Sequence, residues 1–215
     1  MYKLHKLFYQ PVWEFSYPEW NEEKDKLAEF LQRDELYLIQ QEYNGLQNTR
    51  ANLFDAPELA GIKEFQTMCA AIAMDDMGYE ANIGITSSWA TRQRAGGFHH
   101  EHTHPNSFLV TVMHIYSDTE TNGTLFLNRQ GPRYQLEPAS NHRRGILEQA
   151  VEIPFTPGSC FVFPSWMSHK TASCKSGVRI MTGANFMPVG PTNTDHYNRY
   201  NFPEIVESEL KQFKG

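Results

Sequence analysis

The alternation of apolar and polar residues that begins near residue 80 constrains the fold of this chain more than any other feature. Ala81, Ile83 and Ile85 are separated by single polar or small residues, and this period of two is typical of a β-strand with one buried face. Short apolar runs bounded by turn residues continue to Phe186. The sequence therefore predicts about seven or eight short strands in this region.

Before residue 80, apolar residues recur at the spacing of amphipathic helices. Ser16 and Glu19 have the spacing of a capping box, which predicts a helix from about residue 20 to Arg33. Asp55 followed by Pro57 predicts a second helix start, and Gly78 its end. A short strand is expected within residues 35–41 and a loop over residues 42–54.

Helices followed by strands predict a mainly β fold with N-terminal supporting helices, an antiparallel two-sheet roll or barrel. We expect one domain over residues 1–215, with a helical support at 1–79, a β core at 80–186 and a tail at 187–215 that ends in a short helix. The polar stretch 128–150 is long for an ordinary connection, and such stretches are often lids or substrate contacts.

Composition narrows the function classes. The net charge of −6 argues against a surface that coats nucleic acid. The three cysteines form no C-x-x-C pair, which favours a reducing, cytoplasmic location. The sequence contains no run of about 20 apolar residues, so it predicts no membrane-spanning segment. A homodimer is allowed by the sequence but not required by it.

Histidines cluster at two places, and both clusters have the properties of metal ligands. His102 and His104 form an H-x-H pair, and in an extended chain two residues at this spacing project from the same face. His169 follows the apolar run of residues 160–164 and is the best candidate for a third ligand. Three protein ligands leave open positions on a metal, as catalysis requires.

Arg179 is a candidate anion-binding residue beside this predicted metal site. It follows His169 by ten residues, on the strand expected to return beside it. A buried arginine is costly unless it meets an anion, and its planar guanidinium suits a carboxylate. The sequence thus predicts a dicarboxylate that chelates the metal at one end and pairs with Arg179 at the other. Tyr116 and His114 share the expected strand face of Val112 and are further candidates to line the site.

Several stretches, spread over most of residues 7–186, match one known family. They are Leu7-Phe8 with Pro11-Val12, Asn52-Leu53-Phe54 with Pro57-Glu58-Leu59, Ser88-Trp89, Gly96-Gly97, His102-Thr103-His104-Pro105-Asn106-Ser107, Phe163-Pro164-Ser165-Trp166 with His169, and Arg179-Ile180 with Asn185-Phe186. In these stretches the sequence resembles the iron(II)- and 2-oxoglutarate-dependent oxygenases, more narrowly a prolyl-hydroxylase-like group described as putative 2-oxoglutarate–iron(II) oxygenases.

The resemblance implies a double-stranded β-helix of jelly-roll or cupin-like form, with iron(II) held by His102, His104 and His169. It implies that Arg179 binds 2-oxoglutarate, with Asn106 and Tyr116 as further contacts. The implied reaction consumes O2, decarboxylates 2-oxoglutarate to succinate and CO2, and hydroxylates an unknown small molecule or protein.

The chain departs from the family pattern at two places. The common ligand set is two histidines and a carboxylate, whereas His104 stands at the carboxylate position. A register with His99 and Glu101 would restore a histidine–carboxylate pair. Where the group has two tyrosines, this chain has Met113 and His114. These departures keep a second hypothesis open, that of a cupin-like metal-binding protein that does not use 2-oxoglutarate.

Overall fold

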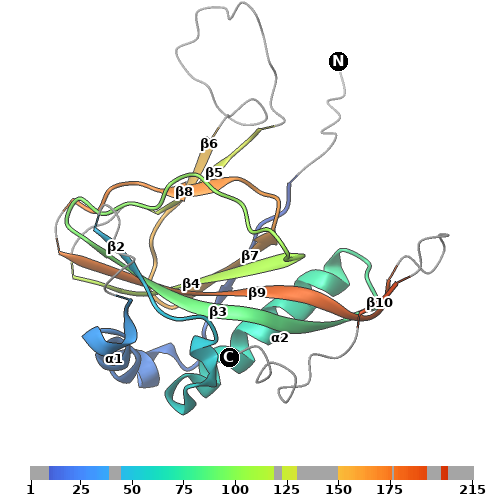
Figure 1. Ribbon diagram of the computed structural model, residues 1–215, viewed down its shortest axis with the longest axis horizontal. Helices are drawn as coiled ribbons and strands as arrows, with labels where there is room; N and C mark the ends of the chain where they lie inside the picture. The colour runs from blue at the N-terminus through green and yellow to red at the C-terminus, as the bar shows by residue number, and fades with distance from the viewer. Residues whose placement is uncertain are drawn as a thin grey trace, which may run out of the picture.

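Two antiparallel β-sheets face each other, and two helices cover the outer face of the larger sheet (Figure 1). The computed structural model describes residues 10–38, 45–118, 123–129, 150–175, 177–192 and 200–202. The arrangement is a double-stranded β-helix, which confirms the prediction of a mainly β two-sheet roll with supporting helices.

The larger sheet has the strand order β1-β7-β4-β9-β3-β2, with β10 paired to β9. The smaller sheet has the order β6-β5-β8. The strands of the larger sheet are β1 (Trp13–Ser16), β2 (Leu46–Asn48), β3 (Asn82–Arg94), β4 (Leu109–Ser117), β7 (Ser159–Pro164), β9 (Val178–Thr192) and β10 (Tyr200–Phe202). Those of the smaller sheet are β5 (Thr124–Leu127), β6 (Ala150–Ile153) and β8 (His169–Thr171).

The two faces of β4 are buried against different layers, which explains why this strand carries apolar residues on both faces. Leu109 and Met113 belong to the cluster between the larger sheet and the helices α1 (Trp20–Leu31) and α2 (Ala60–Asp76). Val110 belongs to a second cluster between the sheets, with Phe126, Phe161, Phe163 and Met167. The inter-sheet space is therefore lined by side chains from both sheets.

A buried amide fastens α2 to the middle of the larger sheet. The Gln66 side chain is fully buried and donates from Nε2 to Thr182 Oγ1 at 3.0 Å. It accepts from Thr111 Oγ1 at 2.6 Å. Because Thr111 lies on β4 and Thr182 on β9, this one side chain sets the position of α2 over two neighbouring strands.

Two predicted helix starts were wrong in detail. Ser16 does not cap α1, because it pairs with Ser159 as the last residue of β1, and no side chain caps the helix at Glu19. Before α2 the chain makes two 3-10 turns, at Leu53–Asp55 and Pro57–Leu59. The predicted end of α2 is confirmed, since Gly78 adopts a φ of 78° directly after the helix.

Two predictions between the helices differ from the structure. Asp34–Leu36 is a 3-10 turn where the predicted strand was to begin, Tyr37 forms an isolated β-bridge with Thr49, and residues 39–41 lie outside the described residues. Leu46–Asn48, in the expected loop, is β2 and pairs with β3. The pairing partner lies more than forty residues away along the chain, so local patterning does not reveal it. The predicted tail helix and most of the stretch 128–150 lie outside the described residues.

No helix in the described part of the chain is long and apolar enough to cross a membrane.

Replacement of Gln66 by leucine is expected to destabilise the fold, because it leaves the hydroxyls of Thr111 and Thr182 buried without this partner. We expect the free energy of unfolding to fall by about 2–4 kcal/mol in urea titrations. Gln32 is exposed, so the matched variant Gln32→Leu should change stability by less than about 0.5 kcal/mol. Equal effects of the two variants would contradict the role assigned to Gln66.

Candidate metal centre and co-substrate site

The first histidine cluster lies beside β8 and is joined to it by an isolated antiparallel β-bridge. The backbone of His102 donates to the carbonyl of His169 at 3.0 Å, and the backbone of His169 donates back to His102 at 3.0 Å. His104 N–H donates to the carbonyl of Ser165 at 2.9 Å. Residues that exchange both hydrogen bonds project their side chains to the same face. His102, His169 and, by alternation, His104 therefore share one face.

Special backbone positions bracket this segment. A Cβ on Gly97 would collide with the carbonyl oxygen of Gly45, so the chain can pass here only with glycine. At the other end, Asn106 is exposed and has a φ of 56°, in the turn that leads into β4. The histidine segment is therefore bounded by Gly97 at one end and by the turn at Asn106 at the other.

The three predicted ligands meet in the inter-sheet space. One nitrogen from each of His102, His104 and His169 lies within 4.8 Å of the other two. His104 Nε2 and His169 Nε2 are 3.3 Å apart, and their rings are nearly parallel, with centroids 5.1 Å apart. The structure thus brings together the residues that the sequence selected.

The hydrogen bonds of the outer ring nitrogens orient two of these imidazoles. His102 Nδ1 lies 2.7 Å from the carbonyl of His100, and His169 Nδ1 lies 3.0 Å from that of Met167. A carbonyl only accepts, so each Nδ1 carries the hydrogen and each Nε2 keeps a lone pair. A metal ion shared by His104 and His169 would satisfy both of their facing nitrogens. The donor set therefore fits a divalent transition metal.

Asn185 and Trp89 position His104. The Trp89 ring stacks on His104 with centroids 5.4 Å apart. The Asn185 side chain opposes the lowering of the His104 pKa, and its amide nitrogen donates to Ser87 Oγ at 3.0 Å. Asn185 occurs in a motif that the sequence analysis quoted, but its contact with His104 depends on β9 lying beside β4 and β3.

Burial keeps the imidazoles neutral. It lowers the pKa of His104 to about 3 and that of His169 to about 4, with the nearby histidines as a further cause. The pKa of His102 is also lowered, mainly by burial. Since a metal binds the unprotonated nitrogen, these residues need not lose a proton at neutral pH.

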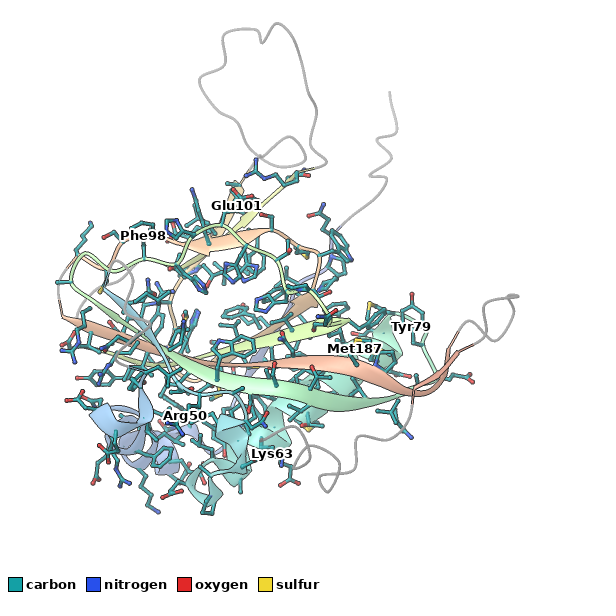
Figure 2. All side chains as sticks on the ribbon, viewed as in Figure 1. Arg50, Lys63, Tyr79, Phe98, Glu101 and Met187 are labelled. Carbon is teal, nitrogen blue, oxygen red and sulfur yellow. The ribbon has the colours of Figure 1, made fainter. Side chains whose placement is uncertain are left out.

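The alternative register through His99 and Glu101 is not assembled. Glu101 accepts hydrogen bonds from Arg129 and Ser168, and these bonds are the main causes of the lowered pKa of its carboxyl group. Figure 2 shows Glu101 on the outer side of its segment, away from the larger sheet. The His99 ring stacks on the His102 ring, with centroids 3.9 Å apart, and lines the cavity.

Arg179 is buried within the same space, with 1% of its surface exposed. Its Nη2 lies 3.2 Å from the sulfur of Met181, its Nη1 lies 3.5 Å from the carbonyl of Gly123, and its guanidinium carbon lies 5.2 Å from the centroid of the Phe155 ring. Burial lowers its pKa to about 10, so it is a cation at neutral pH. Met181 in turn lines the cavity that contains the histidines.

Neither Tyr116 nor Asn106 lies in this cavity. A register shift between His114 and Tyr116 changes the face of the strand, so that Tyr116 packs against the cluster on the helix side. His114 stays between the sheets, against Phe155 and Phe161. Asn106 shapes the turn before β4 and is exposed. The sequence analysis gave no role to Thr124, which does line the cavity.

Removal of a metal ligand is expected to abolish tight metal binding. We expect His102→Ala and His169→Ala to lower the affinity for cobalt(II) by at least about a hundredfold in calorimetric titrations. Glu101→Gln should stay within a few-fold of the parent chain, because that carboxylate points away from the ligand atoms. Loss of cobalt binding in Glu101→Gln with retention in His102→Ala would support the other register.

The metal-free protein is expected to lose stability as the pH falls from about 7 to about 5. His104 and His169 bind no proton in this range when folded but titrate near 6.5 when unfolded. The unfolded state therefore takes up more protons, and each residue lowers the free energy of unfolding by up to about 1.4 kcal/mol per pH unit. Urea titrations in the presence of a chelator measure this slope, which should be shallower in His169→Gln. A slope unaffected by that change would contradict the assignment.

Comparisons with known proteins agree with this geometry. Residues 87–185 match the family described as "Putative 2OG-Fe(II) oxygenase", where 2OG is 2-oxoglutarate. No curated protein matches the sequence significantly.

Solved structures share the fold at low identity. A prolyl-4-hydroxylase from Pseudomonas putida has a TM-score of 0.58 at 9% identity, covering 82% of this chain and 92% of that one. HygX from Streptomyces hygroscopicus, with nickel and 2-oxoglutarate bound, has a TM-score of 0.58 at 8% identity and covers 83% of each chain. The 2-oxoglutarate-dependent epimerase SnoN has a TM-score of 0.61 at 13% identity, covering 93% of this chain and 84% of that one.

The matched segment contains the three histidines and Arg179, and the family uses iron(II), 2-oxoglutarate and O2. Over residues 87–185 the chain is therefore similar to the iron(II)- and 2-oxoglutarate-dependent oxygenases, and it shares the fold of solved members.

Proposed function

We propose that His102, His104 and His169 hold iron(II), and that Arg179 binds the distal carboxylate of 2-oxoglutarate. The observation that carries this proposal is the convergence of three neutral imidazoles and one buried cation on the same inter-sheet space. A dicarboxylate spanning the two would have its metal-chelating end at the histidines and its charged end at Arg179.

The surroundings of Arg179 support an anionic ligand. Its contacts include a thioether, a carbonyl oxygen and an aromatic ring. A carboxylate is a stronger acceptor for a guanidinium than any of these, because the hydrogen bond is then charged on both sides. A ligand carboxylate would also offset the cost of burying the cation.

When bound, iron(II) and 2-oxoglutarate would supply the oxidative chemistry with O2, one oxygen atom entering succinate as CO2 is released and the other being inserted into a C–H bond. The chain itself contributes position and environment. His102, His104 and His169 would hold the metal through three nitrogens, which leaves further coordination positions for other ligands. Trp89, Val112 and Met181 line the cavity and limit the access of water.

The proposed catalytic unit is a single domain of residues 1–215, acting in the cytoplasm on a small molecule or a protein segment that reaches the metal. A homodimer remains a prediction that a measurement of mass in solution would test.

Arg179→Met is expected to lose 2-oxoglutarate while keeping the metal. In an anaerobic titration of the iron(II)-loaded protein, 2-oxoglutarate should produce a visible metal-to-ligand charge-transfer band. We expect the dissociation constant from this band to rise by at least about a hundredfold in Arg179→Met, and by less in Arg179→Lys, which keeps the charge. Iron affinity measured without 2-oxoglutarate serves as the control and should be unchanged.

The same titration separates the oxygenase from the alternative. If the parent chain binds iron but shows no band and no heat with 2-oxoglutarate, the cupin-like metal-binding protein becomes the better description.

A further inference from the structure

We propose that His114 donates a hydrogen bond from Nε2 to the distal carboxylate of 2-oxoglutarate beside Arg179, and that the hydroxyl of Thr124 is a further donor to it. The inference rests on the proposed function of Arg179 and adds two residues that position the co-substrate.

The hydrogen bonds of His114 decide which nitrogen carries its hydrogen. The backbone N–H of Thr156 donates to His114 Nδ1 at 3.1 Å. Nδ1 is therefore the acceptor, and a neutral ring then has its hydrogen on Nε2. Burial, with the charge of Arg179 as a second cause, lowers the pKa of His114 to about 3, so the ring is neutral at physiological pH.

This Nε2–H group is buried without a hydrogen-bond acceptor among the described residues. His114 has no exposed surface, and its Nε2 atom makes no hydrogen bond there. A buried donor in this state destabilises the folded protein. The ring is also held in place, since it stacks on Phe155 with centroids 4.4 Å apart and lies 5.0 Å from Phe161. A ligand that supplies a hydrogen-bond acceptor for Nε2–H when it binds would explain this fixed donor.

His114 is adjacent to Arg179. Both contact the ring of Phe155, one by stacking and the other through its guanidinium. In the register of β4 with β9, His114 is opposite Met181, whose sulfur lies 3.2 Å from Arg179 Nη2. Met181 lines the cavity of the three histidines, as does Val112, two residues before His114 on β4. The imidazole and the guanidinium therefore lie together behind these two cavity-lining residues.

Thr124 adds an independent observation. Its side chain is 4% exposed and lines the cavity, and its Oγ1 has no hydrogen-bond partner among the described residues. It directly follows Gly123, whose carbonyl oxygen is 3.5 Å from Arg179 Nη1. A guanidinium, an imidazole N–H and a hydroxyl are all able to donate, so the matching ligand group accepts several hydrogen bonds and carries negative charge. A carboxylate has both properties.

The test compares two ligands that differ at the distal end. 2-Oxoglutarate has a distal carboxylate, whereas oxalate chelates the metal but has no atom that reaches Arg179. Each is titrated calorimetrically, without oxygen, into the iron(II)-loaded full chain and its variants. His114→Phe keeps the aromatic ring and removes the N–H, and Thr124→Val keeps the branched shape and removes the hydroxyl. His114→Gln restores a donor near the position of Nε2.

We expect His114→Phe to weaken 2-oxoglutarate binding by about tenfold to a hundredfold, and Thr124→Val by about tenfold. Oxalate binding should stay within about twofold in both, and His114→Gln should recover part of the loss. Thermal unfolding of the metal-loaded variants identifies a misfolded protein. If His114→Phe fails to fold, Thr124→Val still decides, since it removes only the hydroxyl of the proposed donor pair.

Two results would overturn the inference. An equal loss of 2-oxoglutarate and oxalate would show that His114 acts through packing or the metal. Unchanged 2-oxoglutarate binding in both His114→Phe and Thr124→Val, with Arg179→Met impaired, would leave the function of Arg179 intact and remove the two donors. Failure of the parent chain to bind 2-oxoglutarate would instead refute the proposed function itself.

Discussion

The antiparallel pair of His102 and His169 is the interaction on which the site depends. Its two backbone hydrogen bonds join the histidine segment to β8 and set which side chains face the cavity. Because side chains alternate along an extended chain, a slip of one residue would turn His102 and His104 outward and Glu101 and Thr103 inward. One β-bridge thus decides between a donor set of three histidines and one that includes a carboxylate. Arg129 and Ser168, which bind Glu101 on the outer side, stabilise the observed register.

Charge explains how such a site would select its ligands. None of the described residues that line the cavity is acidic, and burial keeps its histidines neutral. With a divalent metal bound and Arg179 protonated, the site would have an excess of positive charge in a medium of low polarity. Dianionic co-substrates are the ligands that such a site favours most. The replacement of the usual carboxylate by His104 strengthens this preference rather than opposing it.

The scaffold holds these groups on regular elements. β4 and β9 are buried on both faces, and Gln66 fastens α2 across them through hydrogen bonds to Thr111 and Thr182. Arg179 and Asn185 therefore project from a strand that is supported from behind by a helix and from the side by β3 and β4. A rigid support of this kind keeps the ligands and the anion-binding groups at a constant separation, which chelation of a dicarboxylate requires.

The sequence by itself determined the fold class and the chemically important residues. The period-two pattern after residue 80 predicted the strands, the H-x-H spacing predicted a shared face for His102 and His104, and their combination with His169 and Arg179 predicted the site. These inferences depend on residue type and on spacing along one strand, which are local properties. For the same reason the capping of α1, the strand β2 and the placement of Tyr116 were wrong or missed.

Only the tertiary structure decided the register of the histidine segment against β8, the order of the strands, and the side of the sheet to which each side chain points. It turned Glu101 outward through pairing with β8 and moved Tyr116 to the helix side through an irregularity in β4. It also brought Thr124 to the cavity, Asn185 beside Ser87 and His114 opposite Met181. Strand pairing and bulges are set by contacts between residues far apart in the chain. The local sequence therefore specified the ligands, and the long-range packing specified their partners.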